Sequence, residues 1–210
     1  MAVIKSSNIL AEHWLNQLRD KNTSSDKFRI GMENIAAVLF CEAIKDISGI
    51  TLKKTIKTPL TRTRGRFLVE KNIYIVPVLR AGLSMLAGVK KLVPEAKVAH
   101  VGLYRNEKTL MPKWYLDKLP KKISKRSVFF VLEPMLATSG TITTVLQRII
   151  ILGATKIYVI GAIMSNTAKE KLERKFPIVT FYVAGIDPKL NSKGYIVPGL
   201  GDAGDRAFNM

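Results

Sequence analysis

The chain has few of the residues that carry disulfide, metal and thiol chemistry. It contains one cysteine, Cys41, and two histidines, His13 and His100. A single cysteine cannot form an internal disulfide, and neither histidine has a Cys or carboxylate at metal-ligand spacing. The sequence therefore excludes a disulfide-stapled fold and argues against a zinc site. Cys41 lies among apolar residues on a segment expected to be helical, so we expect a buried structural thiol rather than a nucleophile.

Long apolar runs are also missing. No run approaches the roughly 20 residues that a membrane-spanning helix needs. The first five residues, Met-Ala-Val-Ile-Lys, lack the apolar segment of a signal peptide. We therefore expect an unsecreted, soluble protein without a membrane partner. Its expected location is the cytoplasm, or the stroma of an organelle that encodes its own copy.

Acidic residues are scarce relative to basic ones. The chain has 34 lysines and arginines against 16 aspartates and glutamates, which gives a net charge of +18. A field of this sign favours anionic ligands, from nucleotides to nucleic acid. The basic residues are scattered, with loose clusters only at 53–66 and 121–126, and neither cluster is interleaved with aromatic residues. We interpret the excess as compositional drift and argue against a nucleic-acid partner.

Several signatures of catalysis are absent or false. The sequence has no GxxxxGK[ST], which excludes an ATPase P-loop, and no GxSxG. Residues 199–204 match GxGxxG, but a dinucleotide fingerprint must open a helix within a βαβ unit. Only six residues follow Gly204, so no such unit can form and the match is spurious.

Apolar runs of strand length alternate with segments of helical spacing. The expected strands are 73–79, 98–104, 128–132, 156–163 and 178–184, and the expected helices between them are 83–92, 142–149 and 166–175. Uninterrupted apolar runs are typical of strands buried on both faces. The order predicts an α/β fold with a mainly parallel sheet flanked by helices. With 47% hydrophobic residues, 1–210 can form a single domain.

The other segments complete this expectation. Two helices, 8–20 and about 25–47, are expected to form an N-terminal helical layer rather than a separate domain. Residues 50–57 read as a weak edge strand and 58–66 as a basic loop. Residues from about 105 to 120 are expected to form a hairpin, because a connection of that length usually has a function. The tail 185–210 has Gly and Pro throughout and no periodicity, yet is too apolar to be disordered.

The stretch 128–145 carries the strongest functional signal. The apolar run 128–132 is followed by Glu133, by the small residues 137–140, and then by a helix-spaced segment. This order places free backbone N–H groups and a helix N-terminus at the carboxyl end of a strand, where anions bind. The hydroxyls of Thr138, Ser139 and Thr141 would add donors. The alternative is an ordinary βα turn with a threonine as N-cap.

Arg80 repeats this arrangement at the end of the strand 73–79, just before a predicted helix. Arginine offers planar, multidentate donors that suit phosphate oxygens. Ligands collect at the carboxyl ends of strands in open α/β sheets, which favours a binding role over an ordinary surface arginine. Arg105 ends the next expected strand in the same way.

Two motifs resemble one known family. Glu133-Pro-Met-Leu-Ala-Thr-Ser-Gly140 resembles the phosphoribosyl-diphosphate (PRPP) loop of type I phosphoribosyltransferases. Its residues are most similar to those of the uracil phosphoribosyltransferase family. Gly194-Tyr-Ile-Val-Pro-Gly-Leu-Gly-Asp-Ala-Gly-Asp205 is similar to that family's uracil-binding signature. The resemblance runs from about Asn8 to the last residue. It departs from the family at Glu133, where the family has Asp, and at Ser139, where it usually has Gly.

The resemblance implies the type I phosphoribosyltransferase fold, with a flap at 105–120 and a uracil-binding segment at 185–210. It also implies a reaction in pyrimidine salvage, in which uracil and PRPP give UMP and diphosphate. The catalytic residues would be Arg80, Arg105 and Asp202, with both arginines on the diphosphate. The PRPP loop would comprise Glu133, Pro134, Met135, Leu136, Ala137, Thr138, Ser139, Gly140 and Thr141. Uracil would contact Ile196, Gly201, Asp202 and Ala203.

The same resemblance implies a set of partners. Mg²⁺ would be the cofactor, held through PRPP and water, because Glu133-Pro134 replaces the two adjacent acids of many phosphoribosyltransferases. GTP is a candidate activator, and a homo-oligomer is expected. The alternative function is a nucleotide-sensing, RNA-binding regulator on the same fold with weak or no enzyme activity. The net charge of +18 favours that alternative, whereas the complete uracil motif argues against it.

Overall fold

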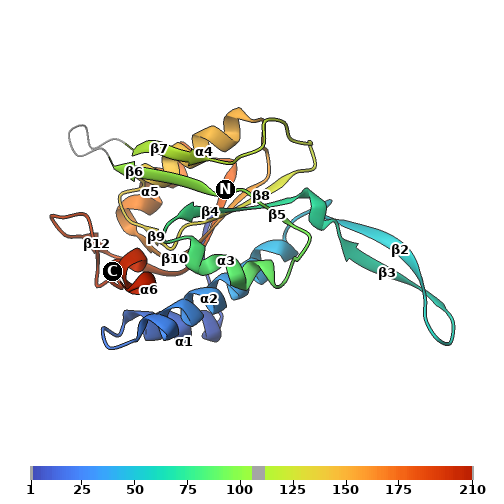
Figure 1. Cartoon of the computed structure of the whole chain (residues 1–210), viewed down its shortest axis with the longest axis horizontal. Helices are drawn as coiled ribbons and strands as arrows, with labels where there is room; N and C mark the ends of the chain where they lie inside the picture. The colour runs from blue at the N-terminus through green and yellow to red at the C-terminus, as the bar shows by residue number, and fades with distance from the viewer. Residues whose placement is uncertain (1, 106–111, 210) are drawn as a thin grey trace.

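The computed structural model describes residues 2–105 and 112–209 (Figure 1). Its main sheet has the strand order β1-β11-β10-β8-β4-β6-β7 among these residues, with β5 added to β4 and β9 to β10. The strands are β1 Ala2–Lys5, β4 Ile73–Leu79, β5 Lys97–Val98, β6 Val101–Arg105, β7 Pro112–Asp117, β8 Val128–Leu132, β9 Met135–Leu136, β10 Ile157–Ser165 and β11 Val179–Asp187. Every pair in this sheet is parallel except β6 with β7. The predicted mainly parallel α/β sheet is confirmed.

Helices cover both faces of the sheet, as Figure 1 shows. One face carries α1 Ile9–Arg19, α2 Ser25–Lys45, α3 Leu83–Lys90 and the short α6 Ala203–Phe208, and the other carries α4 Gly140–Ile151 and α5 Asn166–Lys175. The position of β8 in the sheet explains why all five of its residues are apolar. Phe130 packs into the core beneath α2, whereas Phe129 packs on the opposite face. Because side chains alternate along a strand, both faces of β8 must be apolar.

The two N-terminal helices form the expected packing layer. Their buried side chains, among them Leu15, Phe28 and Met32, belong to the core on that face of the sheet. The expectation of a buried Cys41 was wrong, because its side chain is exposed. Buried positions on α2 recur at helical spacing through Leu39, Phe40 and Ala43, and Cys41 lies outside that stripe.

A basic hairpin corrects the reading of residues 50–66. β2 Thr51–Lys57 and β3 Arg62–Leu68 pair antiparallel in a two-stranded sheet of their own. Neither is an edge strand of the main sheet, and most of 58–66 is therefore not loop. The hairpin projects away from the body of the molecule (Figure 1). Most of its residues are exposed, so the burial that gives a strand its apolar alternation is missing here.

The remaining segments are short. β6 and β7 form the antiparallel hairpin expected near 105–120, while residues 106–111 lie outside the described part of the chain. In the tail, β12 Lys189–Leu190 pairs with β13 Ile196–Val197, and α6 follows. β1, α6 and the 3-10 turn Glu70–Asn72 were not expected from the sequence. Within the described residues, no helix is long and apolar enough to cross a membrane.

Candidate active site

The first part of the site is the loop that follows β8. We call residues 133–141 loop 133–141. After Glu133, the chain makes the short strand β9 against β10 and then enters α4 at Gly140. A cavity of about 210 Å³ is lined by Glu133, Met135, Ala137, Thr138, Ser139, Gly140, Thr141 and Ile142. The first N–H groups of a helix have no intrahelical partner, so this wall offers backbone donors to an anion.

Ser139 carries the strained point of this loop. Its φ of 67° and ψ of 6° are left-handed, a conformation that glycine, the family's usual residue here, adopts without steric cost. Ser139 is also the N-cap residue of α4, but its side chain makes no cap hydrogen bond. Its Oγ instead donates to the carbonyl oxygen of Thr138 at 2.6 Å. The alternative of a Thr138 N-cap is therefore wrong, and Thr138 lies exposed on the cavity wall.

β10 holds loop 133–141 from behind. The N–H groups of Ala162 and Ile163 both donate to the Pro134 carbonyl at 3.1 Å. Ser165, which is fully buried, donates from Oγ to the Ala137 carbonyl at 2.8 Å and accepts from the Ala168 N–H at 3.0 Å. The sequence analysis did not identify Ser165. A serine just before a predicted helix is an N-cap signal, but nothing local indicates the bond to Ala137.

The second part of the site is the turn that precedes α6, which we call turn 194–204. A cavity of about 250 Å³ is lined by Ala81, Glu133, Met135, Ala137, Gly194, Tyr195, Ile196, Gly201, Asp202, Ala203 and Gly204. It contains all four residues expected to contact uracil. Ala81, Gly194, Tyr195 and Gly204 were missed as lining residues. Glycines offer no side chain for a sequence argument to use, and Ala81 reaches this cavity only through the folding of α3 against the tail.

Glu133 belongs to both cavities, together with Met135 and Ala137. Burial raises the pKa of the Glu133 carboxyl to about 8, and a hydrogen bond from the Met135 N–H opposes this rise. The two motifs also lie close together, because a Cβ added at Gly194 would lie 3.3 Å from Thr138 Cγ2.

Asp202 has a structural role at the edge of this cavity. It is the N-cap of α6, and its Oδ1 accepts from the Gly204 and Asp205 N–H groups at 2.8 and 3.0 Å. The preceding Gly201 has a φ of +80°, which glycine adopts without steric cost. Asp202 therefore orders the turn whatever it contributes to a ligand.

The expected arginines and the loop residues Pro134 and Leu136 are placed differently. Arg80 follows β4, and its Nη2 lies 3.8 Å from Asp205 Oδ1 beside the second cavity. Arg105 ends β6 opposite Pro112, but its side chain lies outside the described part of the structure. Leu136 packs into the core beneath α4. Pro134 is buried and contributes its carbonyl to the bonds with β10.

Comparison with known proteins agrees with this geometry. The family model described as uracil phosphoribosyltransferase matches residues 5–210. A uracil phosphoribosyltransferase of Clostridium botulinum is 44% identical over 206 residues, which cover 98% of this chain and 97% of the relative. One from Thermosipho melanesiensis is 43% identical over 199 residues, covering 95% and 94%.

Solved structures extend the comparison to the fold. A protein of Aquifex aeolicus superposes with a TM-score of 0.91 at 38% identity, covering 99% of this chain and 98% of that chain. A hypoxanthine phosphoribosyltransferase of Staphylococcus aureus reaches a TM-score of 0.51 at 13% identity, covering 76% and 75%, and shows the fold alone. The match to the family model over nearly the whole chain, with relatives above 40% identity, leads to one conclusion: the chain belongs to the uracil phosphoribosyltransferase family.

Proposed function

We propose that this chain transfers the phosphoribosyl group of PRPP to uracil, giving UMP and diphosphate. The observation that carries the proposal is that two cavities of different character share a wall of Glu133, Met135 and Ala137. One offers a helix N-terminus and hydroxyls for a phosphate, and the other offers a space rich in glycine and alanine for a base. A ribose between them would place its hydroxyls beside Glu133.

The chemistry needs positioning more than a nucleophile. The bond between ribose C1 and the diphosphate oxygen breaks, the bond from C1 to uracil N1 forms, and the N1 proton is released. Charge develops on the departing diphosphate and on an oxocarbenium-like ribose, so anion-binding groups and fixed orientation supply most of the acceleration. In this proposal, 137–141 hold the 5′-phosphate and Arg80 and Arg105 receive the diphosphate. Asp202 helps to hold PRPP beside the base.

Mg²⁺ fits this site as an ion that arrives with its substrate. Among the described residues, no cluster of three or more His, Cys, Asp or Glu could hold a metal. The carboxylates that border the cavities, Glu133 and Asp202, come from separate elements. We propose that diphosphate oxygens and water supply most of the ligands, with these carboxylates contacting the bound water. When bound, the ion would offset the charge of the diphosphate.

Activation by GTP and a homo-oligomeric state are further proposals that rest on the family. The rival function, an RNA-binding regulator on the same fold, draws on the net charge of +18. A complete cavity at turn 194–204 favours the enzyme, because a regulator has no need to orient a free base against ribose.

The deciding experiment is UMP formation from labelled uracil with PRPP and Mg²⁺, with the product resolved by chromatography. We expect UMP and diphosphate in equal amounts. A protein that binds UMP or RNA tightly but forms no labelled UMP would support the regulator and contradict the proposed enzyme.

A further inference from the structure

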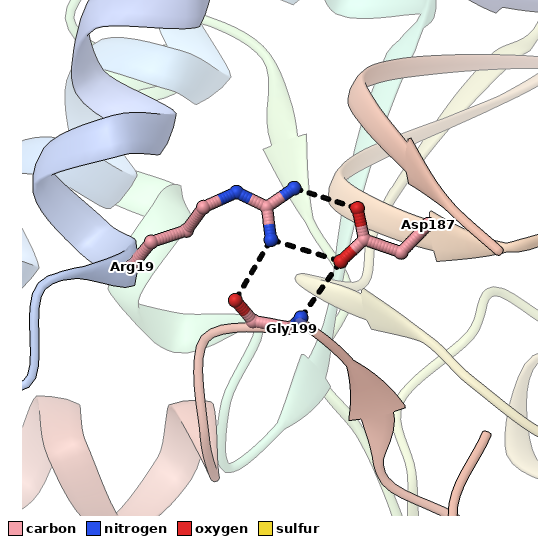
Figure 2. Close-up of polar contacts among 3 residues, drawn as sticks. All are labelled: Arg19, Asp187 and Gly199. Carbon is pink, nitrogen blue, oxygen red and sulfur yellow. Dashed lines mark hydrogen bonds and ion pairs between the residues drawn. The ribbon is translucent and has the colours of Figure 1, made fainter. Parts of the chain in front are cut away.

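Arg19, near the start of the chain, and Asp187, near its end, hold turn 194–204 by hydrogen bonds to Gly199. We call this set of bonds the tie. Arg19 ends α1, and Asp187 ends β11. The Asp187 carboxylate accepts from Arg19 Nη2 on Oδ1 at 2.7 Å and from Arg19 Nη1 on Oδ2 at 2.8 Å. Figure 2 shows both side chains converging on the Gly199 backbone.

Both backbone polar groups of Gly199 are used in this tie. Its N–H donates to Asp187 Oδ2 at 2.7 Å, and its carbonyl accepts from Arg19 Nη1 at 2.8 Å (Figure 2). The peptide groups on either side of the Gly199 Cα therefore cannot rotate without breaking one of these hydrogen bonds. Gly199 has a φ of +66°, and a Cβ there would lie 2.1 Å from the Ile196 carbonyl oxygen. The turn is consequently pressed against Ile196 on one side and anchored by Arg19 and Asp187 on the other.

The carboxylate is charged although Asp187 is only 4% exposed. Burial would raise its pKa, but the hydrogen bonds from Arg19 and the Gly199 N–H, with the charges of Arg19 and Lys5, outweigh burial and leave the pKa below its usual value. An ionised carboxylate accepts hydrogen bonds and donates none. Asp187 can therefore bind the Gly199 N–H and the guanidinium at the same time.

A buried ion pair is a weak source of stability, because the cost of desolvation offsets much of the attraction between the charges. Its benefit here is geometric. The expected uracil contacts Ile196, Gly201, Asp202 and Ala203 lie within four residues of Gly199 on either side. The elements around it are short, with two residues in β13 and six in α6. Hydrogen bonds within β13 and α6 therefore fix the orientation of few of the N–H and C=O groups in the turn.

We propose that Arg19 and Asp187 are positioning residues that orient the Gly199 peptide and, through it, the backbone groups that select uracil. This inference rests on the proposed function, because it assigns the base to the cavity at turn 194–204. Neither side chain is required to touch the substrate. Loss of the tie raises the KM for uracil and relaxes base selectivity, whereas the KM for PRPP changes less, because loop 133–141, which carries most of the proposed PRPP contacts, is held independently by β10.

The first test is Asp187→Asn, which retains the shape of the side chain. One amide oxygen can still accept from Gly199, but the amide nitrogen is a donor and opposes the arginine. We expect the KM for uracil to rise about tenfold, as for loss of a hydrogen bond between charged groups, with less than a threefold change for PRPP. Arg19→Lys keeps the charge but not the planar fork, so it should give the same pattern in milder form, and it serves if Asp187→Asn does not fold.

A pair of variants separates positioning from stability. Arg19→Met leaves a buried carboxylate without its cation and should lower the melting temperature markedly. The double variant Arg19→Met with Asp187→Asn removes the unpaired charge and should recover much of that loss. Its Gly199 carbonyl still lacks the guanidinium donor, so the KM for uracil should stay raised. Recovery of stability without recovery of uracil KM is the signature of a positioning role.

Arg29→Met is the matched control. Arg29 on α2 also ties the N-terminal helices to the tail, through a bond from Nη1 to the Ala207 carbonyl at 2.8 Å, but no recorded contact in the described structure links it to Gly199. We expect a lower melting temperature with an unchanged KM for uracil. If Arg29→Met and Asp187→Asn raise that KM equally, or if both Asp187→Asn and Arg19→Lys leave it unchanged, the inference is overturned while the proposed function stands. A wild-type chain that forms no UMP overturns the proposed function and this inference with it.

Discussion

Loop 133–141 and turn 194–204 line adjoining cavities, but they are held in place in different ways. The loop leads from β8, whose five residues are all buried, into the twelve-residue helix α4. Its backbone bonds run to the neighbouring strand β10. The turn contains the two-residue strand β13 and leads into the six-residue helix α6. Its anchors, Arg19 and Asp187, come from α1 and β11.

This difference implies different sensitivities to mutation. Mutations in the loop should alter only the loop itself, because β8 and α4 on either side of it remain packed in the core. The turn should respond to distant changes as well. Arg206, for example, donates to the Leu200 carbonyl at 2.8 Å and to the Asp20 carbonyl at 2.6 Å, and its guanidinium lies 4.5 Å from the Phe28 ring. The base cavity is therefore built on the N-terminal helices, whereas the phosphate cavity is built on the sheet.

Base selectivity should give the largest effect and tests the rigidity of turn 194–204. Uracil has an acceptor at O4 and a donor at N3, and cytosine reverses both. Backbone groups held in place cannot exchange roles, so cytosine would leave buried groups unpaired. We expect kcat/KM for cytosine to be lower by roughly 10⁴ or more. Comparable turnover of uracil and cytosine in competition would show that the backbone groups of turn 194–204 can rearrange, and would contradict the view that this turn is rigidly anchored.

Glu133→Asp probes the wall that the two cavities share. The glutamate carboxylate now reaches back to the Met135 N–H, and the family carries the shorter Asp. A misplacement of about 1 Å can cost about 10²-fold in rate, so we expect Asp to raise kcat/KM by up to that factor. Glu170→Asp, an exposed site on α5, is the control and should change nothing. A tenfold drop in kcat/KM on Glu133→Asp would mean that the loop has adapted to glutamate.

Thr138→Val tests the phosphate side alone. Thr138 lines the first cavity without capping α4, so loss of its hydroxyl should weaken PRPP binding about tenfold, the value of one hydrogen bond to a charged group. The melting temperature of Thr138→Val should be the same as that of the wild type. Thr143→Val is the control, because Thr143 Oγ1 is buried without a hydrogen-bond partner in the described structure. It should keep PRPP affinity and gain slightly in stability, as titration calorimetry and melting curves would record. Equal losses of PRPP affinity would contradict the assignment to Thr138.

The smallest expected effect is a pH dependence of stability from Glu133. Its pKa is raised from 4.5 to about 8 in the folded protein, so between these values the folded state binds more protons than the unfolded state. The free energy of unfolding therefore falls as pH rises through this window. We expect a loss of about 1 kcal/mol, because water in the cavity reaches the carboxyl. Glu133→Gln should remove this component from melting curves recorded from pH 5 to 9. An unchanged slope would place the Glu133 pKa near its ordinary value.

Local patterns in the sequence were enough to predict the sheet strands β4, β8, β10 and β11, the helices between them and the position of loop 133–141 at a strand end. Those features depend on local signals: apolar runs of strand length, helical spacing and small residues between them.

The other features depend on contacts between segments that are distant in the sequence. The β2–β3 hairpin has no buried face to mark it in the sequence, and Cys41 is exposed because the buried stripe of α2 passes it by. The bonds from Ser165 to Ala137 and from Arg19 and Asp187 to Gly199 join residues that are 28, 180 and 12 positions apart. Such contacts depend on how the chain closes around its sheet. Each partner has an ordinary local environment in the sequence, so its role becomes visible only when the fold brings the partners together.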